Sequence, residues 1–239
     1  MDAMILAAGL GTRLGDLTRD TPKALIDVSG TTALERVARR LIAAGADHLI
    51  INVHHHAERI IEFVRARDDF GTTVSFSHEA DAPLETGGGL LHAKPLLRHT
   101  GSFFLHNVDV LCDVDLHAMY TSHVHSGALA TLAVSRRETS RYLLFDENGL
   151  CGRMHSRGGG PAEVHADCVD PIPFAFAGIH VISRALMDLV TETGAFSIID
   201  VYLRLASQGR PIARYDIGGA RWLEIGNPER LEEARRALG

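Results

Sequence analysis

The spacing of apolar residues along the first half of the chain predicts alternating strands and helices. Short apolar runs bounded by glycine or polar residues predict buried strands, and apolar residues three and four positions apart predict helices that bury one face. Strands are expected at 1–8, 48–53, 73–77 and 102–106, and helices at 32–44, 57–66 and 90–97. This alternation is typical of βαβ units, which build a mostly parallel sheet with helices on both faces.

The second half of the chain has a more mixed pattern. Strands are expected at 128–135, 141–146, 173–183 and 211–215, and helices at 184–191, 197–207 and 228–238. The first two of these strands are expected to pair, with a turn at 147–149, and the glycine-rich stretch 157–170 predicts a mobile surface loop. Because no repeat or linker interrupts the pattern, we expect residues 1–239 to form one α/β domain, with a Rossmann-like, mostly parallel mixed sheet flanked by helices.

The composition excludes several classes of protein. With 239 residues, of which 46% are apolar, the chain can bury a core without disulfides or metals. Its net charge of −6 argues against a nucleic-acid partner, which selects clustered positive charge. No apolar run approaches the roughly 18 residues of a membrane span, and the first apolar stretch is too short for a signal peptide. We therefore expect no membrane partner.

The cysteine usage indicates the compartment. Cys112, Cys151 and Cys168 are odd in number, widely spaced and without a CxxC pair. This usage fits a reducing environment and gives no signal for structural zinc. The expected location is the cytoplasm.

A glycine loop directly after the first strand is the strongest chemical feature of the sequence. Its residues, Gly9-Leu10-Gly11-Thr12-Arg13, allow backbone N–H groups to approach a phosphate closely. It is not the dinucleotide fingerprint, because Leu14 stands at the third glycine position, and no Walker A triplet follows. Lys23, stiffened by Pro22, comes ten residues after Arg13. Two cations beside a glycine loop suit a polyphosphate.

The string LAAGLGTRLGDLTRDTPKALIDVSG at 6–30 resembles the N-terminal motif of the sugar-1-phosphate nucleotidyltransferases, also called NDP-sugar pyrophosphorylases. The resemblance continues through PLETGGG at 83–89, HNVDV at 106–110, FAGIHVIS at 176–183 and RWLEIGNPERLEEA at 221–234. It is closest to the short bacterial branch similar to mannose-1-phosphate guanylyltransferases and N-acetylmuramate-1-phosphate uridylyltransferases. That branch has no β-helix extension, and 239 residues leave no room for one.

The resemblance implies an enzyme that transfers a nucleotidyl group from a nucleoside triphosphate to a sugar 1-phosphate, with Mg²⁺ as cofactor and pyrophosphate as second product. Arg13 would hold the leaving pyrophosphate, and Lys23 would bridge the α-phosphate and the incoming sugar phosphate. The residues expected to contact the nucleotide are Ala7, Ala8, Gly9, Leu10, Gly11, Thr12, Glu79, Gly87, Gly88 and Asn107. Glu79 is equally well explained as a surface acid, and the three glycines at 87–89 as a flexible turn.

The resemblance also implies a metal site, from which this chain departs in two ways. Asp109 and Glu224 would be the ligands, since carboxylate oxygens suit Mg²⁺. Val108 replaces the glycine of the family's Asn-Gly-Asp triplet, and Glu224 replaces an aspartate.

Sugar recognition is less well defined. Longer family members carry a mid-chain lysine that binds the sugar phosphate, but no lysine follows Lys94 in this chain. The role is therefore vacant or taken by Arg141, Arg153 or Arg157. Tyr142 resembles a sugar contact, although a strand aromatic can also serve packing.

Two other functions remain open. Asp113 and Asp115 form the DxD motif of many glycosyltransferases, but we favour capping of a helix that begins near Leu116. A regulatory protein that binds nucleotide-sugars with little catalysis would fit the departures at Val108 and Glu224. The sequence does not name the base, the sugar or the oligomeric state.

Overall fold

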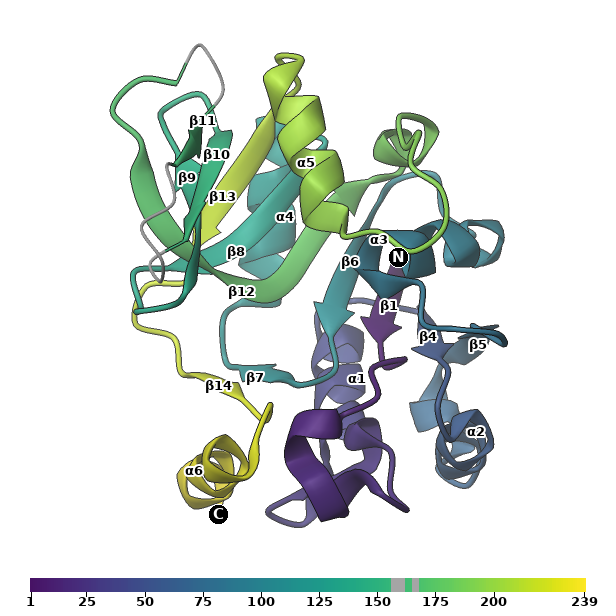
Figure 1. The fold of residues 1–239 in the computed structure, drawn as a ribbon. Helices are drawn as coiled ribbons and strands as arrows, with labels where there is room; N and C mark the ends of the chain where they lie inside the picture. Colours follow the sequence, from purple (N-terminus) through teal and green to yellow (C-terminus); the bar gives the residue numbers. More distant parts are fainter. Residues whose placement is uncertain (156–161, 165–167) are drawn as a thin grey trace.

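The computed structural model describes residues 1–155, 162–164 and 168–239, and most of the loop expected at 157–170 lies outside these ranges. The central element is a ten-stranded sheet in which eight strands follow the order β11-β10-β9-β12-β6-β1-β4-β5. β8 pairs with β12, and β13 pairs with β8. Helices cover the sheet on both sides, and the C-terminal helix α6 lies near the glycine loop of the N-terminal segment (Figure 1).

The first half of the chain forms the parallel part of the sheet. Its strands are β1 (Asp2–Leu6), β4 (His48–Val53), β5 (Thr73–His78) and β6 (Ser102–Asn107). Every neighbouring pair among them is parallel. Its α-helices are α1 (Ala33–Ala43), α2 (Ala57–Arg65), α3 (Glu85–Ala93) and α4 (Leu116–Ser126). The predicted βαβ alternation is confirmed in this half.

The second half is largely antiparallel and is organised by one long strand, β12. Its strands are β8 (Ala130–Ser135), β9 (Arg141–Phe145), β10 (Leu150–His155), β11 (Glu163–Val164), β12 (Ile172–Ser183) and β13 (Ile212–Asp216). The predicted pairing of 128–135 with 141–146 is wrong, because β12 pairs with both β8 and β9 and lies between them. A register shift between Phe176 and His180, with Gly178 at φ 79°, lies inside the pairing of β12 with β8, and the pairing of β12 with β6 begins just after it at Ile179.

The remaining elements are short, apart from two helices. The α-helices are α5 (Ile198–Ser207) and α6 (Pro228–Leu238), and the short strands are β2 (Asp27–Val28), β3 (Thr31–Thr32), β7 (Val110–Cys112) and β14 (Trp222–Glu224). The 3₁₀ turns are Thr12–Thr18, Lys23–Leu25, Asp68–Gly71, Lys94–Leu96 and Arg184–Asp188. The helix expected at 184–191 is therefore a 3₁₀ turn. No helix among the described residues is long and apolar enough to cross a membrane.

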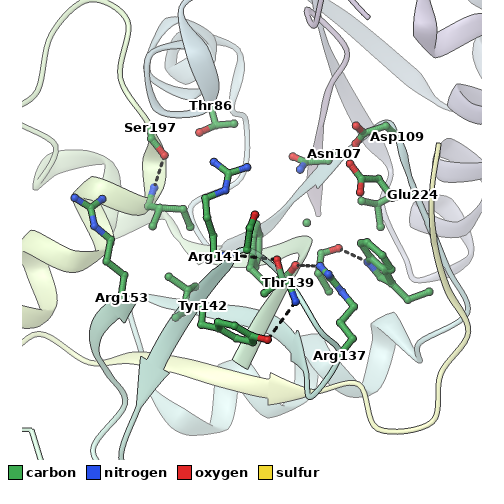
Figure 2. Close-up of a pocket in the computed structure, with 18 of the residues that line it drawn as sticks. Thr86, Asn107, Asp109, Arg137, Thr139, Arg141, Tyr142, Arg153, Ser197 and Glu224 are labelled. Atoms are coloured by element: carbon green, nitrogen blue, oxygen red, sulfur yellow. Dashed lines mark hydrogen bonds between the residues drawn. The ribbon is translucent and has the colours of Figure 1, made fainter. Parts of the chain in front are cut away.

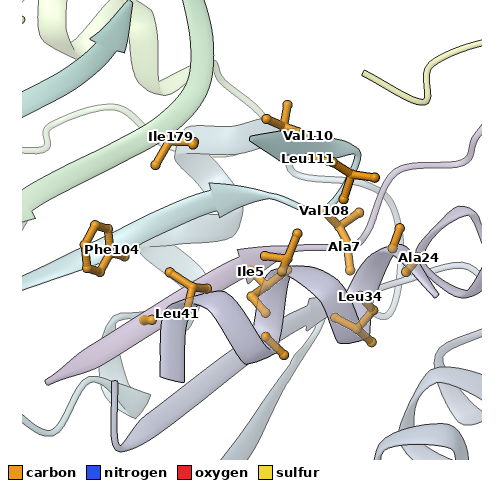
Figure 3. Packing of buried hydrophobic residues seen from close by; sticks show 14 of the residues in the cluster. Ile5, Ala7, Ala24, Leu34, Leu41, Phe104, Val108, Val110, Leu111 and Ile179 are labelled. Carbon is orange, nitrogen blue, oxygen red and sulfur yellow. The ribbon is translucent and has the colours of Figure 1, made fainter. Parts of the chain in front are cut away.

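Two buried clusters occupy the two faces of the sheet. Ile5 of β1 packs in the same cluster as Leu34 and Leu41 of α1, whereas its neighbour Met4 belongs to the cluster that contains α3 and α5. Figure 3 shows the first cluster continuing toward the end of β6, where Val108 is 5% exposed. Burial of this side chain stabilises the segment that follows β6, and Val108 is not among the residues with positive φ. The backbone there does not require the glycine that the family pattern has.

The three glycines at 87–89 lie inside α3, not in a turn. A β-carbon at Gly87 would lie 2.3 Å from the Phe196 ring, and one at Gly88 would lie 2.3 Å from the backbone oxygen of Gly194. A β-carbon at Gly89 would lie 2.6 Å from a carboxylate oxygen of Glu79. Glycine is therefore explained here by close packing of α3 against its neighbours, which outweighs its poor helix propensity.

The cysteines differ from the sequence expectation. Cys151 of β10 and Cys168 are joined by a disulfide, and Cys112 is free and buried. The carboxylate of Asp146 lies within 4.8 Å of both sulfurs, but its oxygens accept backbone N–H groups of Asn148, Gly149 and Val169. Reducing conditions therefore cannot be inferred from the cysteine pattern.

Thiol titration checks this pairing. We expect one reactive thiol per chain when the protein is unfolded without reductant, and three after reduction, because only Cys112 is unpaired. In the native state Cys112 should react slowly, since it is 6% exposed. Three thiols without reductant would contradict the disulfide.

Candidate active site

Two adjoining cavities lie where the parallel strands end. The larger has a volume of about 670 Å³ and lies between the sheet's first half and the β9–β10 strands, and the smaller has a volume of about 220 Å³. Thr86, Asn107 and Asp109 line both. Ligands of α/β sheets bind beyond the carboxyl ends of the strands, which is where Asn107 and Asp109 follow β6.

The glycine loop after β1 offers unpaired backbone donors. Within the described residues, the amides of Ala8, Gly9, Leu10 and Gly11 donate no hydrogen bond. Gly11 has φ 66°, and the Thr18 hydroxyl donates to its carbonyl oxygen at 3.0 Å, which fixes the loop. A β-carbon at Gly11 would lie 2.9 Å from the Thr18 side chain. Such a row of free N–H groups forms an anion-binding concavity.

Lys23 and Asp109 form an ion pair at the centre of the site. The Lys23 ammonium donates to Asp109 Oδ2, although 86 positions separate the two residues in the sequence. Their side chains are 11% and 21% exposed, so the pair is largely shielded from water. Both residues line the smaller cavity, together with Ala8 and Gly9 of the glycine loop. A charge placed here acts more strongly than at the surface.

Glu224 reaches the same place through a strand pair that sequence periodicity did not predict. β14 runs antiparallel to β7, with Glu224 opposite Val110, and the Ile225 N–H donates to the Asp109 carbonyl oxygen at 3.0 Å. Figure 2 shows the Asp109 and Glu224 side chains beside each other at the edge of the larger cavity. Arg230 donates to Glu224 Oε2, and Arg13 Nη2 lies 3.8 Å from Oε1.

Gly226 makes room for the longer carboxylate. A β-carbon at this position would lie 2.8 Å from Glu224 Oε1 and 3.4 Å from Arg13 Nη2. The absence of a β-carbon at Gly226 therefore lets the extra methylene of glutamate be accommodated beside Arg13.

Substituting Gly226 tests this arrangement. We expect Gly226→Ala to lower kcat/KM about a hundred-fold by displacing the Glu224 carboxylate, with little change in melting temperature. Gly219→Ala is the matched control, because a β-carbon there meets nothing within 4 Å. Equal activity of both variants would show that the position of Glu224 is unimportant.

The donor set at this edge suits a hard divalent cation. Asp109 and Glu224 supply carboxylate oxygens, the ligand type that Mg²⁺ prefers, and the neighbouring cavity leaves room for water and phosphate oxygens. Lys23 and Arg230 balance the two negative charges. The residues present therefore fit the cofactor that the sequence implied.

The expected nucleotide contacts are distributed unevenly. Ala8, Gly9, Glu79 and Asn107 line the smaller cavity, whereas Ala7 is buried and donates its N–H to the Asn52 carbonyl oxygen. Glu79 is 3% exposed, not a surface acid, and it accepts from Asn52 Nδ2 and from the Leu84 N–H, each at 2.7 Å.

Four of the other expected nucleotide contacts lie at the open side of the glycine loop or in α3. Leu10 is 46% exposed and Thr12 is exposed, both at the open side of the loop. Gly87 and Gly88 are buried in α3, where they face the Phe196 and Gly194 segment. Neither glycine lines a cavity where a nucleotide could contact it. Their neighbour Thr86 lines both cavities.

The wall of the larger cavity contains Tyr142 and a residue that the sequence did not single out, Arg137. The Thr139 N–H donates to the Tyr142 hydroxyl at 3.2 Å, which closes the turn between β8 and β9 (Figure 2). The Arg137 guanidinium lies 3.8 Å from the centre of the Trp222 ring and donates to the Phe176 carbonyl oxygen at 2.7 Å.

The surroundings of Arg137 disfavour its charged form. Burial lowers the pKa of Arg137, with a smaller lowering by Arg230, and its Nε has no hydrogen-bond partner among the described residues. His180 lines the same cavity, but burial lowers the pKa of His180 to about 3, so the imidazole is neutral at pH 7. An anion in the cavity would therefore meet Arg137 beside a neutral His180.

The DxD motif is used for structure. The Asp115 carboxylate accepts the Ala118 N–H at the start of α4, which confirms the predicted cap. Asp113 accepts the Arg221 N–H at 2.7 Å, and this hydrogen bond holds the backbone just before β14. Neither residue lines the two cavities.

Comparison with known proteins covers almost the whole chain. The family description of nucleotidyl transferases matches residues 2–239. The chain is 31% identical to N-acetylmuramate alpha-1-phosphate uridylyltransferase of Caulobacter vibrioides, over 95% of this chain and 92% of that relative. It is 30% identical to mannose-1-phosphate guanylyltransferase catalytic subunit beta of Drosophila melanogaster, and spans 60% of that longer relative. A solved UDP-glucose pyrophosphorylase of Acinetobacter baumannii superposes with a TM-score of 0.79 at 19% identity, over 100% of this chain and 93% of that one.

The chain therefore belongs to the nucleotidyl transferase family. It is an enzyme of the group that transfers nucleotidyl groups to sugar 1-phosphates, as the sequence motifs implied. The mixed α/β sheet flanked by helices is the fold of this group and confirms the expected architecture.

Proposed function

We propose that the smaller cavity binds the nucleoside triphosphate and the larger one the sugar 1-phosphate, with reaction at Lys23 and Asp109 between them. The observation that carries this assignment is the Lys23–Asp109 ion pair, set against the free amides of the glycine loop in one cavity and Arg137 in the other. Residues 1–239 would act as one nucleotidyltransferase domain.

The chemistry is an in-line substitution at the α-phosphorus. An oxygen of the sugar 1-phosphate forms a bond to this phosphorus while the bond to the bridging oxygen of the β-phosphate breaks, so pyrophosphate leaves with the bonding electrons. Charge increases on the α-phosphoryl oxygens and on the leaving group, so catalysis rests on positioning and electrostatics. Lys23 would stabilise the α-phosphoryl oxygens.

Arg13 would hold the leaving pyrophosphate. Its side chain is 68% exposed and lies 3.8 Å from Glu224, so it is free to turn toward a ligand on the loop. The amides of 8–11 would bind the phosphates, and Thr12 would border them. Asn107, Glu79 and the rim formed by Leu10 would enclose the nucleoside, with Ala7, Gly87 and Gly88 shaping the floor behind them.

Asp109 and Glu224 would hold Mg²⁺. When bound, this ion neutralises charge on the triphosphate and on the incoming phosphate.

At the sugar end, Arg137 would bind the sugar 1-phosphate, and Tyr142 would lie beside the sugar ring. Arg137 supplies the positive charge that the family's mid-chain lysine provides elsewhere, and its stacking on Trp222 fixes its direction. The enzyme would work in the cytoplasm, where nucleoside triphosphates are abundant.

A substrate matrix tests the proposal. Pyrophosphate release is measured with Mg²⁺ and four nucleoside triphosphates, each combined with a set of sugar 1-phosphates. The set begins with N-acetylmuramate 1-phosphate with UTP and mannose 1-phosphate with GTP, for which the two relatives are named. We expect release with at least one pair and its loss when EDTA is added. Tight binding of an NDP-sugar with no turnover in either direction would favour a regulatory protein instead.

A further inference from the structure

Among the described residues, the arginines that line the larger cavity outnumber its carboxylates. Five arginines of the described part of the chain, which does not include Arg157, line it: Arg13, Arg137, Arg141, Arg153 and Arg230. Arg153 pairs with Asp200 and Glu163, and Arg13 and Arg230 share Glu224. Among the described residues, Arg137 and Arg141 have no carboxylate partner within ion-pair distance. In the part of the chain that the structure describes, two guanidinium groups without an ion pair therefore face one cavity, where the single unpaired carboxylate is Glu138.

The two unpaired arginines lie at different parts of the cavity. Arg137 lies on Trp222, on the side of Glu224, whereas the Arg141 side chain points toward Thr86 and Ser197 (Figure 2). Arg141 begins β9, and Tyr142 beside it is fixed through its hydroxyl, so the wall that presents Arg141 is ordered. The Arg141 side chain itself makes no hydrogen bond to the described residues.

One phosphate cannot satisfy both groups. Under the proposed function, the phosphate of the sugar 1-phosphate would lie at the reacting end, near Asp109 and Arg137, and the sugar would extend from there across the cavity. The volume of about 670 Å³ accommodates more than a hexose, since drug-sized ligands occupy pockets of roughly 300–1,000 Å³.

We propose that the sugar substrate carries a second acidic group, distant from the anomeric phosphate, and that Arg141 binds it. This inference rests on the proposed function of the two cavities. The planar guanidinium suits a carboxylate or phosphate through two parallel N–H donors, and a neutral sugar would leave it solvated. Arg141 is thus a specificity-determining residue for the substituent on the sugar.

Matched sugars isolate the acidic group. N-acetylmuramate 1-phosphate and N-acetylglucosamine 1-phosphate differ by a carboxylate-bearing ether, and glucuronate 1-phosphate and glucose 1-phosphate differ by a carboxylate in place of a hydroxymethyl group. Glucose 1,6-bisphosphate tests a phosphate as the second anion. We expect kcat/KM for at least one acidic member to exceed that of its neutral counterpart by about ten- to a hundred-fold.

Substitution of Arg141 then tests the assignment. Arg141→Gln should reduce the acidic-over-neutral ratio of kcat/KM at least ten-fold, mainly through KM, and Arg141→Lys should restore part of it. Arg136→Gln is the matched control, because Arg136 precedes the same turn but lies over the Phe174 ring and does not line the cavity. Its ratio should equal that of the wild type.

Two results would overturn the inference while the proposed function stands. Turnover of every neutral sugar as fast as its acidic partner would do so, as would an unchanged preference in Arg141→Gln. The absence of pyrophosphate release with any of these sugars and any nucleoside triphosphate would overturn the proposed function and this inference together.

Discussion

Lys23→Met is expected to lower kcat/KM by about a thousand-fold, the cost of removing one transition-state charge from a shielded site. The side chain is 11% exposed and contacts Asp109 between the two cavities, so water does not replace its charge efficiently. Methionine keeps an unbranched side chain as far as Cε and removes the ammonium. The loss should appear mainly in kcat, because the charge is needed where negative charge develops on the α-phosphoryl oxygens.

The chain provides a matched control for this variant, since it has one other lysine. Lys94 pairs with Asp188 and with the Met187 carbonyl oxygen, and it lines neither cavity. Lys94→Met should retain the wild-type kcat/KM. Melting temperatures measured for both variants separate a chemical defect from unfolding. Comparable activity of Lys23→Met and Lys94→Met would remove Lys23 from the mechanism.

Gly88→Ala is expected to lower the free energy of unfolding by about 2–3 kcal/mol, near the upper range for overpacking a buried position. A β-carbon at Gly88 would lie 2.3 Å from the Gly194 carbonyl oxygen, which belongs to the backbone and cannot rotate away. The Gly87 and Gly88 amides both donate to the Phe196 carbonyl oxygen, so moving α3 would also disturb these bonds. For a chain of this size, the loss corresponds to a decrease in melting temperature of roughly 4–12 °C.

Gly101→Ala controls for the general effect of replacing glycine. A β-carbon there has ordinary contact at 3.9 Å with the Tyr120 hydroxyl, and its φ is not positive. Its melting temperature should stay within about 2 °C of the wild type, because exposed substitutions change stability little. A Gly88→Ala protein as stable as Gly101→Ala would show that α3 and the 194–198 segment can separate without cost.

The sequence predicted the parallel half of the fold because its signals are local. β1, β4 and β6 each contain a short apolar run, β5 alternates apolar and polar residues, and α1 and α2 have apolar residues at helical spacing. The antiparallel half depends on β12, whose first residues pair with β9 and whose remaining length pairs with both β8 and β6. Pairing with a strand that comes much later in the chain leaves no local periodic signal, so the expected hairpin of 128–135 with 141–146 was wrong.

The site shows the same division between local and long-range information. The glycine loop, Lys23 and Asp109 were identifiable from motifs that lie at the ends of predicted strands. The contact between Glu224 and the Asp109 segment depends on β14 pairing with β7, more than 100 positions earlier in the chain. Arg137 belongs to no motif, and only its position at the end of β8 indicated a place near the ligand.

Glycine occurs at different positions of this chain for different physical reasons. Gly11 has the positive φ expected of a phosphate-binding turn, whereas Gly87, Gly88 and Gly89 have helical backbone and are small because neighbours approach them. A glycine run before a helix looks the same in the sequence in both cases. Close approach depends on residues 194–198, which the local pattern does not connect with α3.

The most direct test of the central claim is ³¹P NMR of a reaction mixture containing the protein, Mg²⁺, a nucleoside triphosphate and the preferred sugar 1-phosphate. The account predicts that the sugar phosphate resonance is lost while the two coupled phosphorus signals of a nucleoside diphosphate sugar and the signal of pyrophosphate grow in equal molar amounts. Lys23→Met should leave the starting spectrum unchanged over the same time. Release of inorganic phosphate with the sugar 1-phosphate intact would contradict nucleotidyl transfer between the two cavities.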